Sequence, residues 1–431
     1  MASALAAAAA LIAITHVSVI DVRTGIVAAD RTVVIGGTKI QSTSSGAPAG
    51  ARLVDGRGKF LIPGLWDMHV HLGGIEAEWF PLYLANGIVG LREMAASKER
   101  LRKVKLHTGP PRIYSTADSL DSPAIGTPQQ ARAAVAALQS IGADFVKVYN
   151  GLSRESYLAI ADESKKLGMD FAGHVPDAIG AAEAARAGQK SIEHLDGILL
   201  ACSAMEAILR KNWLAGQPLR PDFLLQTYSA QKAQALFATF RKYGVWQCPT
   251  LVQARFESSV NDIAMTADPH LRYVRRDYLD DWRNKLPMLR DVGLEKRLFD
   301  KQCALAAAMH RAGVKFLAGT DAPAYYAIPG FGLHDELLLM VERAGFSPLA
   351  ALQSATINPN EFFSRDGGVI EQGRPAELVL LDANPLADIR NTRQIRGVFA
   401  GGRYLDKAAL VKIHDGVAAA VTKAPLESDK Q

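Results

Sequence analysis

The strongest constraint on the fold is a repeated alternation of short apolar segments with helical segments. Eight segments have the length and apolar character of buried strands, and helical patterns lie between most of them. They are 61–72, 86–94, 111–116, 143–151, 169–176, 189–197, 244–252 and 313–323. This alternation predicts an α/β protein with a (β/α)₈ barrel, the TIM barrel fold. An open doubly wound sheet is the alternative, although no Gly-x-Gly-x-x-Gly turn supports a dinucleotide-binding version of it.

The two ends of the chain differ from this middle part. The segment 14–62 and the segment after Arg365 are rich in strand and turn patterns. The simplest arrangement pairs both ends into one small β-sandwich beside the barrel. We therefore predict a β-sandwich domain formed by 1–62 and 365–431, and a barrel domain formed by 63–364.

Two connections inside the barrel are longer than the fold needs. Both have helical patterns, and they span about 196–244 and 252–313. Loops that follow barrel strands lie on the catalytic face of this fold. The inserts are therefore predicted to form lids or walls of a substrate pocket, with packing helices or an oligomer contact as the alternative.

Composition narrows the class of protein. The chain has 431 residues, of which 48% are hydrophobic and 22% charged, as in ordinary globular proteins. The net charge is +5, but the basic residues are scattered or interleaved with acids, so we expect no nucleic-acid partner. The three cysteines are far apart and form no Cys-x-x-Cys motif, which argues against a disulfide framework or a cysteine zinc site.

The alanine-rich N-terminus leaves the compartment open. The apolar run 1–14 is too short to cross a bilayer and lacks the basic start of a signal peptide. It is either the remnant of an export signal or an extension of the first helix or strand. We expect a soluble protein without a membrane segment, either cytoplasmic or exported.

A pair of histidines ends the first predicted strand of the barrel. His69 and His71 are separated by one residue, and residues i and i+2 of a strand point to the same side. Both imidazoles can therefore reach one metal ion, and imidazole suits Zn²⁺ and similar divalent metals.

Four further polar residues occupy strand ends where apolar residues are expected. Lys147 is flanked by valines in a strand pattern, and a lysine in such a place is rarely buried without a role. His174, His194 and Asp321 each end a later strand. Carboxyl ends of the strands form the active-site face of a (β/α)₈ barrel. Six such residues on five strands predict a metal site.

These six residues stand in the motifs PGLWDMHVH, FVKVY, AGHVP, SIEHLDG and GTDAP. Together with the segments 336–363 and 368–392, the motifs resemble the amidohydrolase superfamily. The chain is most similar to the imidazolonepropionase-like branch, which includes binuclear prolidases and ochratoxin-type amidases. The resemblance spans nearly the whole chain and is more specific for the superfamily than for the substrate.

The resemblance implies a site for two divalent metal ions, with Zn²⁺ as the expected metal. His69, His71 and Asp321 would hold the more buried ion, and His174 and His194 the more exposed one. Lys147 would bridge both ions as a carbamate formed with CO₂. Carboxylation requires a neutral amine, which burial of the lysine favours.

The implied reaction is hydrolysis of a C–N bond in a small amide or peptide-like substrate. A hydroxide shared by the two metals would attack the carbonyl carbon. Asp321 would act as general base and then as general acid. Tyr149 lies two residues beyond Lys147 and could hydrogen-bond the substrate carbonyl, with packing at the barrel rim as the alternative. His334 could contact the substrate or cap a helix.

Two alternatives stay open. One is a mononuclear ring-opening hydrolase or deaminase of the imidazolonepropionase type, and the other is a non-catalytic binding protein on the same fold. Pro176 and the two inserts depart from the family pattern near the substrate pocket, so the sequence does not select the substrate. The sequence also leaves association into a homo-oligomer open.

Overall fold

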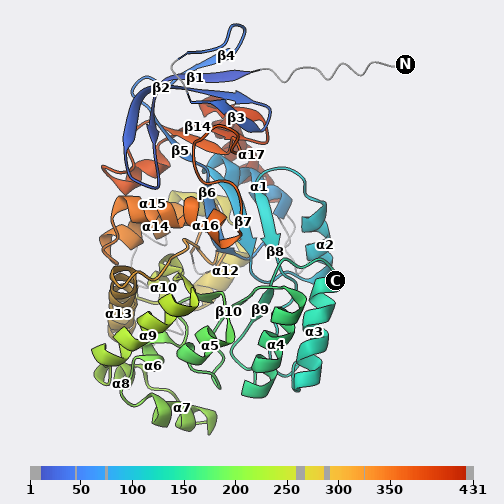
Figure 1. The fold of residues 1–431 in the computed structure, drawn as a ribbon, viewed down its shortest axis with the longest axis vertical. Helices are drawn as coiled ribbons and strands as arrows, with labels where there is room; N and C mark the ends of the chain where they lie inside the picture. Colours follow the sequence, from blue (N-terminus) through green and yellow to red (C-terminus); the bar gives the residue numbers. More distant parts are fainter. Residues whose placement is uncertain are drawn as a thin grey trace.

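The computed structural model has a β-sheet at one end of the molecule and alternating strands and helices beneath it (Figure 1). The structure describes residues 11–43, 46–72, 76–258, 267–285, 292–324 and 326–423. The sheet contains strands from both ends of the chain, as predicted. The alanine-rich start of the chain and parts of the second insert lie outside the described residues.

The sheet at the end of the molecule has the strand order β15-β14-β13-β5-β1-β2-β3, and β4 also pairs with β1. Its strands are β1 (Ile12–Ile20), β2 (Val27–Gly36), β3 (Lys39–Ser42), β4 (Arg52–Asp55), β5 (Phe60–Pro63), β13 (Leu378–Leu381), β14 (Ile395–Ala400) and β15 (Arg403–Asp406). The N-terminal and C-terminal parts meet where β5 and β13 pair in antiparallel register, with Leu61 opposite Leu380.

Strand β13 separates two hydrophobic cores. Leu378 and Leu380 belong to the core of the end sheet, whereas Val379 and Leu381 belong to the large core of the rest of the molecule. This division follows from the two-residue period of a strand, because successive side chains point to opposite faces. A run of four apolar residues therefore fits a strand that is buried on both sides.

The middle of the chain contains two groups of parallel strands. The first group is β6 (Leu65–Val70), β7 (Ile88–Glu93) and β8 (Arg112–Ser115). The second group is β9 (Val146–Val148), β10 (Phe171–Gly173), β11 (Ser191–Glu193) and β12 (Trp246–Cys248). Every residue of β6, β7 and β9 to β12 is buried, as expected for parallel strands covered by helices on their outer side, whereas β8 is buried only at Ser115.

Hydrogen bonds connect the two groups at both gaps between them. At one gap the Asp144 amide, just before β9, donates to the carbonyl of Ser115 at the end of β8 at 2.9 Å, and the Leu120 amide, in the segment after β8, donates to the Lys147 carbonyl at 2.8 Å. At the other gap the Leu317 amide donates to the Gln247 carbonyl, and the Met68 amide to the Ala318 carbonyl, both at 2.9 Å. The segment that precedes Asp321 thus contacts both groups of strands.

Helices follow the strands of the middle region. The first five are α1 (Glu76–Ala85), α2 (Lys98–Leu106), α3 (Pro128–Ser140), α4 (Arg154–Leu167) and α5 (Ala181–Ala187). Helix α3 begins after an N-cap at Thr127, whose hydroxyl accepts a hydrogen bond from the Gln130 amide. Helix α4 ends at Gly168, whose φ of 67° places it in the left-handed region that favours glycine.

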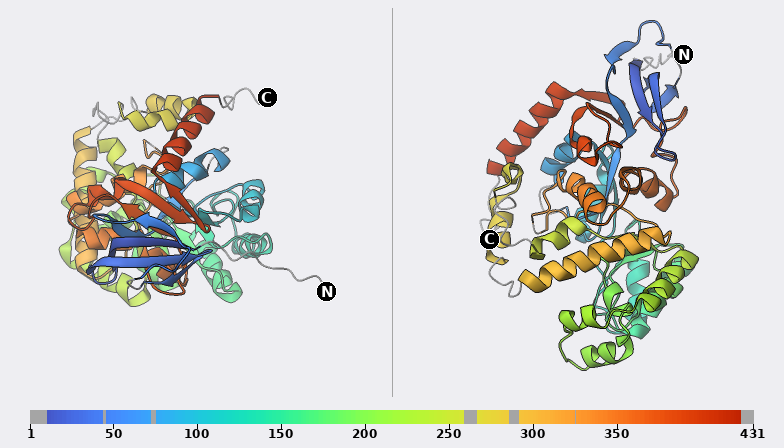
Figure 2. Two further views of the ribbon diagram at one scale, coloured as in Figure 1. Left: turned by 90° about the horizontal axis from the view of Figure 1, so that it is seen from above. Right: turned by 90° about the vertical axis from the view of Figure 1, so that its left-hand side faces the viewer.

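Both inserts are helical in the residues that the structure describes. The first contains α6 (Ile198–Ala201), α7 (Glu206–Leu214), α8 (Pro221–Gln226) and α9 (Ala230–Tyr243). The second contains α10 (Leu251–Ser258), η1 (Pro269–Tyr273), α12 (Arg276–Lys285) and α13 (Val292–Arg311). Figure 2 shows the long helix α13 crossing the molecule, and α13 packs against α8 and α10.

The remaining helices lead back to the end sheet. They are α14 (Gly332–Glu342), α15 (Pro348–Ser354), α16 (Ile357–Phe362), η3 (Ile389–Arg393) and α17 (Lys407–Lys423). Helix α17 packs against α1 and η1, so the C-terminal helix covers part of the middle region. Among the described residues, no helix combines the length and the apolar character that crossing a membrane requires.

Candidate metal centre

The carboxyl ends of the parallel strands carry the polar residues singled out in the sequence. His69 lies in β6 and His71 follows it directly, while Lys147 lies in β9. His174 follows β10 and His194 follows β11. Asp321 comes after the segment that pairs with β6 and β12. Both His194 (φ 59°) and Asp321 (φ 62°) have left-handed backbone, which turns the chain sharply at the strand end.

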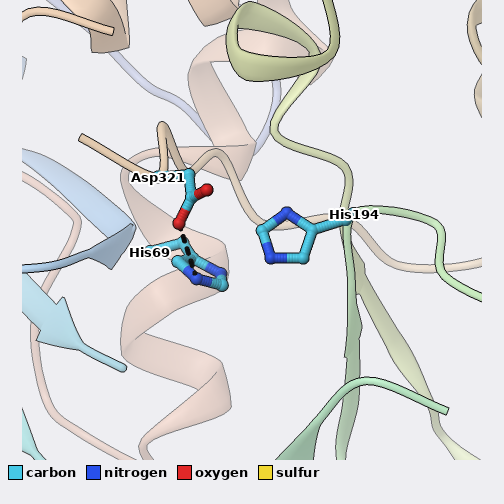
Figure 3. A group of neighbouring side chains, drawn as sticks. All are labelled: His69, His194 and Asp321. Carbon is cyan, nitrogen blue, oxygen red and sulfur yellow. Dashed lines mark ion pairs between the residues drawn. The ribbon is translucent and has the colours of Figure 1, made fainter. Parts of the chain in front are cut away.

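The side chains of His69 and His71 both approach the carboxylate of Asp321. Its Oδ1 atom lies 3.2 Å from Nε2 of His69 and 3.0 Å from Nε2 of His71 (Figure 3 shows the pair with His69). His69 and His71 therefore both direct their Nε2 atoms to one carboxylate oxygen, as their i, i+2 spacing predicts.

His194 and His174 extend this cluster from the neighbouring strands. The ring centroids of His69 and His194 are 4.5 Å apart, and those of His194 and His174 are 5.0 Å apart. His69, His194 and Asp321 each offer one ligand atom, and these atoms lie within 4.8 Å of one another (Figure 3). The three residues form a candidate metal site of two imidazoles and one carboxylate.

Three histidines of the cluster are held through Nδ1, so their Nε2 atoms are available to a metal. The Nδ1 atom of His69 lies 2.9 Å from Glu193 Oε2. His174 Nδ1 lies 2.6 Å from Asn150 Oδ1, and His194 Nδ1 lies 2.7 Å from Thr250 Oγ1. Metal-binding histidines commonly use the second ring nitrogen in this way, because the hydrogen bond fixes the ring and its tautomer.

The donor atoms fit a divalent cation. In the described residues, His69 Nε2 and Asp321 Oδ1 are buried and have no hydrogen-bond partner. His69 Nε2 lies 3.2 Å from Asp321 Oδ1. When the ring proton of His69 is on Nδ1, both of these atoms are acceptors, and no hydrogen bond joins them. Buried polar atoms without partners are rare in proteins, because each one carries a desolvation cost. A divalent metal would satisfy both atoms, and imidazole with carboxylate is a common zinc ligand set.

Burial controls the protonation of the cluster. It lowers the pKa of His194 to about 3, and it lowers the pKa of His69 and His174 as well. Burial alone would raise the pKa of Asp321, but His194 and His69 outweigh it and hold that pKa well below its ordinary value. At neutral pH the site therefore offers neutral imidazoles and an ionised carboxylate, which are the forms that bind metals.

Lys147 lies in the same interior. Its side chain is buried, and burial lowers its pKa and so favours the neutral amine. Gly173 on the adjacent strand has a φ of 136°, and a Cβ atom there would lie 2.2 Å from the Val148 carbonyl oxygen and 3.0 Å from Lys147 Cδ. Glycine is therefore required where the lysine side chain passes the neighbouring backbone.

Tyr149 lies beside the cluster, directly after β9. Its ring packs on His174 with centroids 4.1 Å apart. Its side chain is 41% exposed, which places it between the cluster and solvent.

The structure does not bring His334 to this cluster. His334 lies inside helix α14, with Nδ1 3.0 Å from Thr392 Oγ1 and Nε2 3.1 Å from the Asn86 carbonyl oxygen. Both ring nitrogens thus contact other parts of the fold. The substrate contact of His334 stays a prediction that this geometry does not support, and the alternative of a helix cap is wrong, because Phe331 is the N-cap of α14.

Several buried charged residues behind the cluster were missed by the sequence analysis. Arg92 pairs with Glu193, and Asp67 binds the backbone of the loop that carries Asp321. A signal for Arg92 was present, since it lies between apolar residues of a buried strand as Lys147 does. Glu193 is adjacent to His194, but only the fold shows that its carboxylate contacts His69.

Comparison with known proteins connects this geometry to a family. The amidohydrolase family model matches residues 149–405, which is more than half of the chain and includes His174, His194 and Asp321. Among curated proteins, ochratoxinase from Aspergillus niger is 32% identical over 99 residues. This match covers 22% of the chain and 20% of the ochratoxinase, so it compares only a fifth of that relative.

Solved structures agree with the fold over nearly the whole chain. A bottromycin amidohydrolase has a TM-score of 0.75 at 22% identity, with 95% of this chain and 90% of that chain covered. A putative prolidase from Bifidobacterium longum has a TM-score of 0.71 at 22% identity, with 95% and 99% covered. The A. niger ochratoxinase structure has a TM-score of 0.64 at 19% identity, with 93% and 96% covered. At these identities the likeness establishes the fold.

Proposed function

The chain belongs to the amidohydrolase family, and we propose that it is a binuclear metal-dependent hydrolase that cleaves C–N bonds. The observation that carries this proposal is the convergence of His69, His194 and Asp321, in which two of the candidate ligand atoms, His69 Nε2 and Asp321 Oδ1, are buried without a hydrogen-bond partner among the described residues. The family assignment confirms the resemblance found in the sequence.

In this proposal, His69, His71 and Asp321 would hold one ion, and His174 and His194 would hold the other. The neutral Lys147 amine would add to CO₂ and release a proton, and the resulting carbamate would supply oxygen ligands to the ions. Burial and the lowered pKa of Lys147 support this role, because only the neutral amine can attack CO₂. Zn²⁺ is the proposed metal, since imidazole and carboxylate ligands suit it.

The chain's own residues supply proton transfer and substrate orientation. When bound, divalent metals would lower the pKa of a water and polarise the substrate carbonyl. Asp321 takes the proton of the attacking water and then gives it to the leaving amine, which breaks the C–N bond. Tyr149 lies next to His174 at the exposed side of the cluster, where its hydroxyl could donate a hydrogen bond to the substrate carbonyl.

The fold completes the proposal. We infer a closed (β/α)₈ barrel, and the hydrogen bonds across both gaps between the strand groups support closure. We also infer a β-sandwich domain from 1–62 and 365–431 beside a barrel domain from 63–364. A separate core in the end sheet supports this division.

The proposed substrate is a small amide or peptide-like molecule. Relatives named as amidohydrolase, prolidase and ochratoxinase support this class. A mononuclear ring-opening hydrolase or deaminase is the rival enzyme function, and a non-catalytic binding protein is the rival of another class. The number of metal ions per chain separates these three functions.

The experiment is elemental analysis of the wild type, Lys147→Ala and Lys190→Ala after loading with Zn²⁺ and bicarbonate. Lys190 is the matched control. It directly precedes β11 and pairs with Asp170, which directly precedes β10, at the strand ends opposite the cluster. We expect about two metals in the wild type and in the control, but about one or fewer in Lys147→Ala. The loaded protein is then assayed with N-acyl amino acids, dipeptides and aryl amides.

The rival functions give different results. About one metal per chain, unchanged in Lys147→Ala, would exclude the bridging lysine and favour the mononuclear enzyme. The absence of bound metal in all three proteins would favour the non-catalytic function.

A further inference from the structure

A continuous chain of hydrogen bonds crosses the interior between the two groups of parallel strands and ends on His69. Arg92 lies on β7 in the first group, and Glu193 lies on β11 in the second. The side chains of Arg92, Glu193 and His69 are buried. The ion pair between Arg92 Nη2 and Glu193 Oε2, at 2.7 Å, therefore links the two groups through the interior.

Three donor nitrogens of Arg92 have defined partners. Its Nε donates to the Met68 carbonyl at 2.6 Å, and its Nη1 donates to Ser191 Oγ at 2.9 Å. Its Nη2 donates to Glu193 Oε2. The planar fork of a guanidinium matches this arrangement, because several donors are fixed relative to one another. Since Met68 directly precedes His69, Arg92 holds both the strand that carries His69 and the carboxylate that its ring contacts.

Glu193 connects Arg92 and Ser191 to the imidazole of His69. Its Oε1 accepts from Ser191 Oγ, and its Oε2 lies 2.9 Å from His69 Nδ1. A carboxylate that accepts from Arg92 and Ser191 can only accept from His69 as well, so Nδ1 carries the ring proton. The lone pair of the imidazole is then on Nε2, which faces Asp321 Oδ1 at 3.2 Å.

We propose that Glu193, fixed by Arg92 and Ser191, is a positioning residue that sets the tautomer and ring orientation of His69 for metal binding. The inference rests on the proposed metal-dependent function, but the tautomer is a property of the metal-free protein. A ligand held in advance binds more tightly, because no ring rotation or proton transfer is needed when the metal arrives.

The test compares Glu193→Gln with Glu163→Gln. The substitution is the same in both, and Glu163 is also buried and paired, with Arg132 and Lys166 each at 3.3 Å, but it lies on α4 away from the cluster. The first readout is the ¹⁵N spectrum of the histidine rings in metal-free protein. We expect protonated Nδ1 at His69 in the wild type and in Glu163→Gln, and a mixture of both tautomers in Glu193→Gln.

The second readout is Zn²⁺ affinity, measured by competition with a chromophoric chelator. We expect Glu193→Gln to weaken binding by about 10–100-fold, as is typical when the partner of a ligating histidine is lost. Glu163→Gln should remain within about twofold of the wild type. Wild-type affinity and an unchanged tautomer in Glu193→Gln would overturn the proposal.

Ser191→Ala covers the case in which Glu193→Gln does not fold. This variant retains the carboxylate and its pair with Arg92 but removes the hydroxyl that joins Arg92 Nη1 to Glu193 Oε1. We expect a smaller loss of Zn²⁺ affinity, more than about twofold but less than about tenfold. An affinity equal to that of Glu163→Gln would overturn the proposal. If the wild type itself binds no metal, the proposed function fails, whereas the tautomer readout still tests the positioning role.

Discussion

Asp67 on β6 accepts two hydrogen bonds from Thr320, one from the backbone amide at 3.0 Å and one from the hydroxyl at 2.7 Å. The same carboxylate also accepts from the His69 amide at 3.3 Å. Thr320 directly precedes Asp321. One buried carboxylate therefore fixes the backbone on both sides of the contact between His69 and Asp321, which sets the distance between these two proposed ligands.

Thr320→Val should destabilise the protein by about 1–3 kcal/mol, because the change keeps the shape but leaves the buried Asp67 carboxylate with one donor fewer. Chemical denaturation of both proteins measures the loss. Thr356→Val is the control, since the buried Thr356 hydroxyl donates to the Leu352 carbonyl away from the cluster. Only Thr320→Val should also weaken Zn²⁺ binding, and equal metal affinity in the two variants would contradict the role given to Asp67.

Asp321→Asn should lower kcat by about 10²–10⁴-fold, because an amide cannot take the proton of the attacking water. The assay is made at saturating metal, with metal content measured on the same sample so that metal loss and proton transfer are separated. Asp335→Asn is the control. Asp335 lies on α14 and pairs with Arg393 of η3. Retention of kcat at full metal content in Asp321→Asn would remove Asp321 from the proton-transfer role.

His334→Ala should lower the free energy of unfolding by about 2–3 kcal/mol, because it leaves a cavity and two partners without their hydrogen bonds. The folded variant should keep kcat/KM within about threefold of the wild type, since the ring contacts Thr392 and Asn86 rather than the cluster. Steady-state kinetics below the unfolding transition makes the comparison. A fall of kcat/KM by about a hundredfold with metal content intact would restore the substrate contact predicted from the sequence.

Glu336 should make stability depend on pH. Burial raises its pKa to about 8 from an ordinary value of 4.5, so the folded protein retains a proton that the unfolded chain releases. The stabilising effect of this proton is complete below about pH 4.5 and is lost as the pH rises through about 8. Glu336→Gln removes this dependence. Its unfolding free energy relative to the wild type should therefore increase between pH 5 and pH 8, and a constant difference would contradict the raised pKa.

Removal of metal should lower the melting temperature of the wild type. A ligand that binds only the folded state stabilises it by about 2.7 kcal/mol at a concentration of 100 Kd. Thermal unfolding before and after chelation measures the change, and Zn²⁺ with bicarbonate should reverse it. Lys147→Ala should show a smaller shift, because one of the two proposed ions is no longer bridged. Identical shifts in the two proteins would argue against the bridging role.

The six proposed ligands could be found from the sequence because each lies in or directly after a recognisable strand pattern. Parallel strands end at one edge, so polar residues at those ends come together whatever the details of packing. The i, i+2 spacing of His69 and His71 similarly fixed their common direction. These inferences need only local patterns and one rule of topology.

The supporting residues could not be placed in the same way. The contact of Glu193 with His69 depends on which strands face each other across the interior, and neighbouring residues in the sequence do not determine this. The packing of Trp282 and Tyr326, whose ring centroids are 5.0 Å apart, likewise joins the second insert to the loop after Asp321. Contacts between distant segments decide both features, so the sequence predicted helices in the inserts but not their partners.

The pairing of β5 with β13 has a consequence for synthesis of the protein. Leu61 faces Leu380 in the finished sheet, so the ribosome must add roughly 320 residues after β5 before its partner exists. At about 5–20 residues per second, the early strands wait about 15–60 s with an unpaired edge. Such an edge is a template for pairing with other chains. The nascent protein is therefore most exposed to aggregation before β13 emerges, and a chaperone that shields β5 during this interval should raise the yield of folded protein.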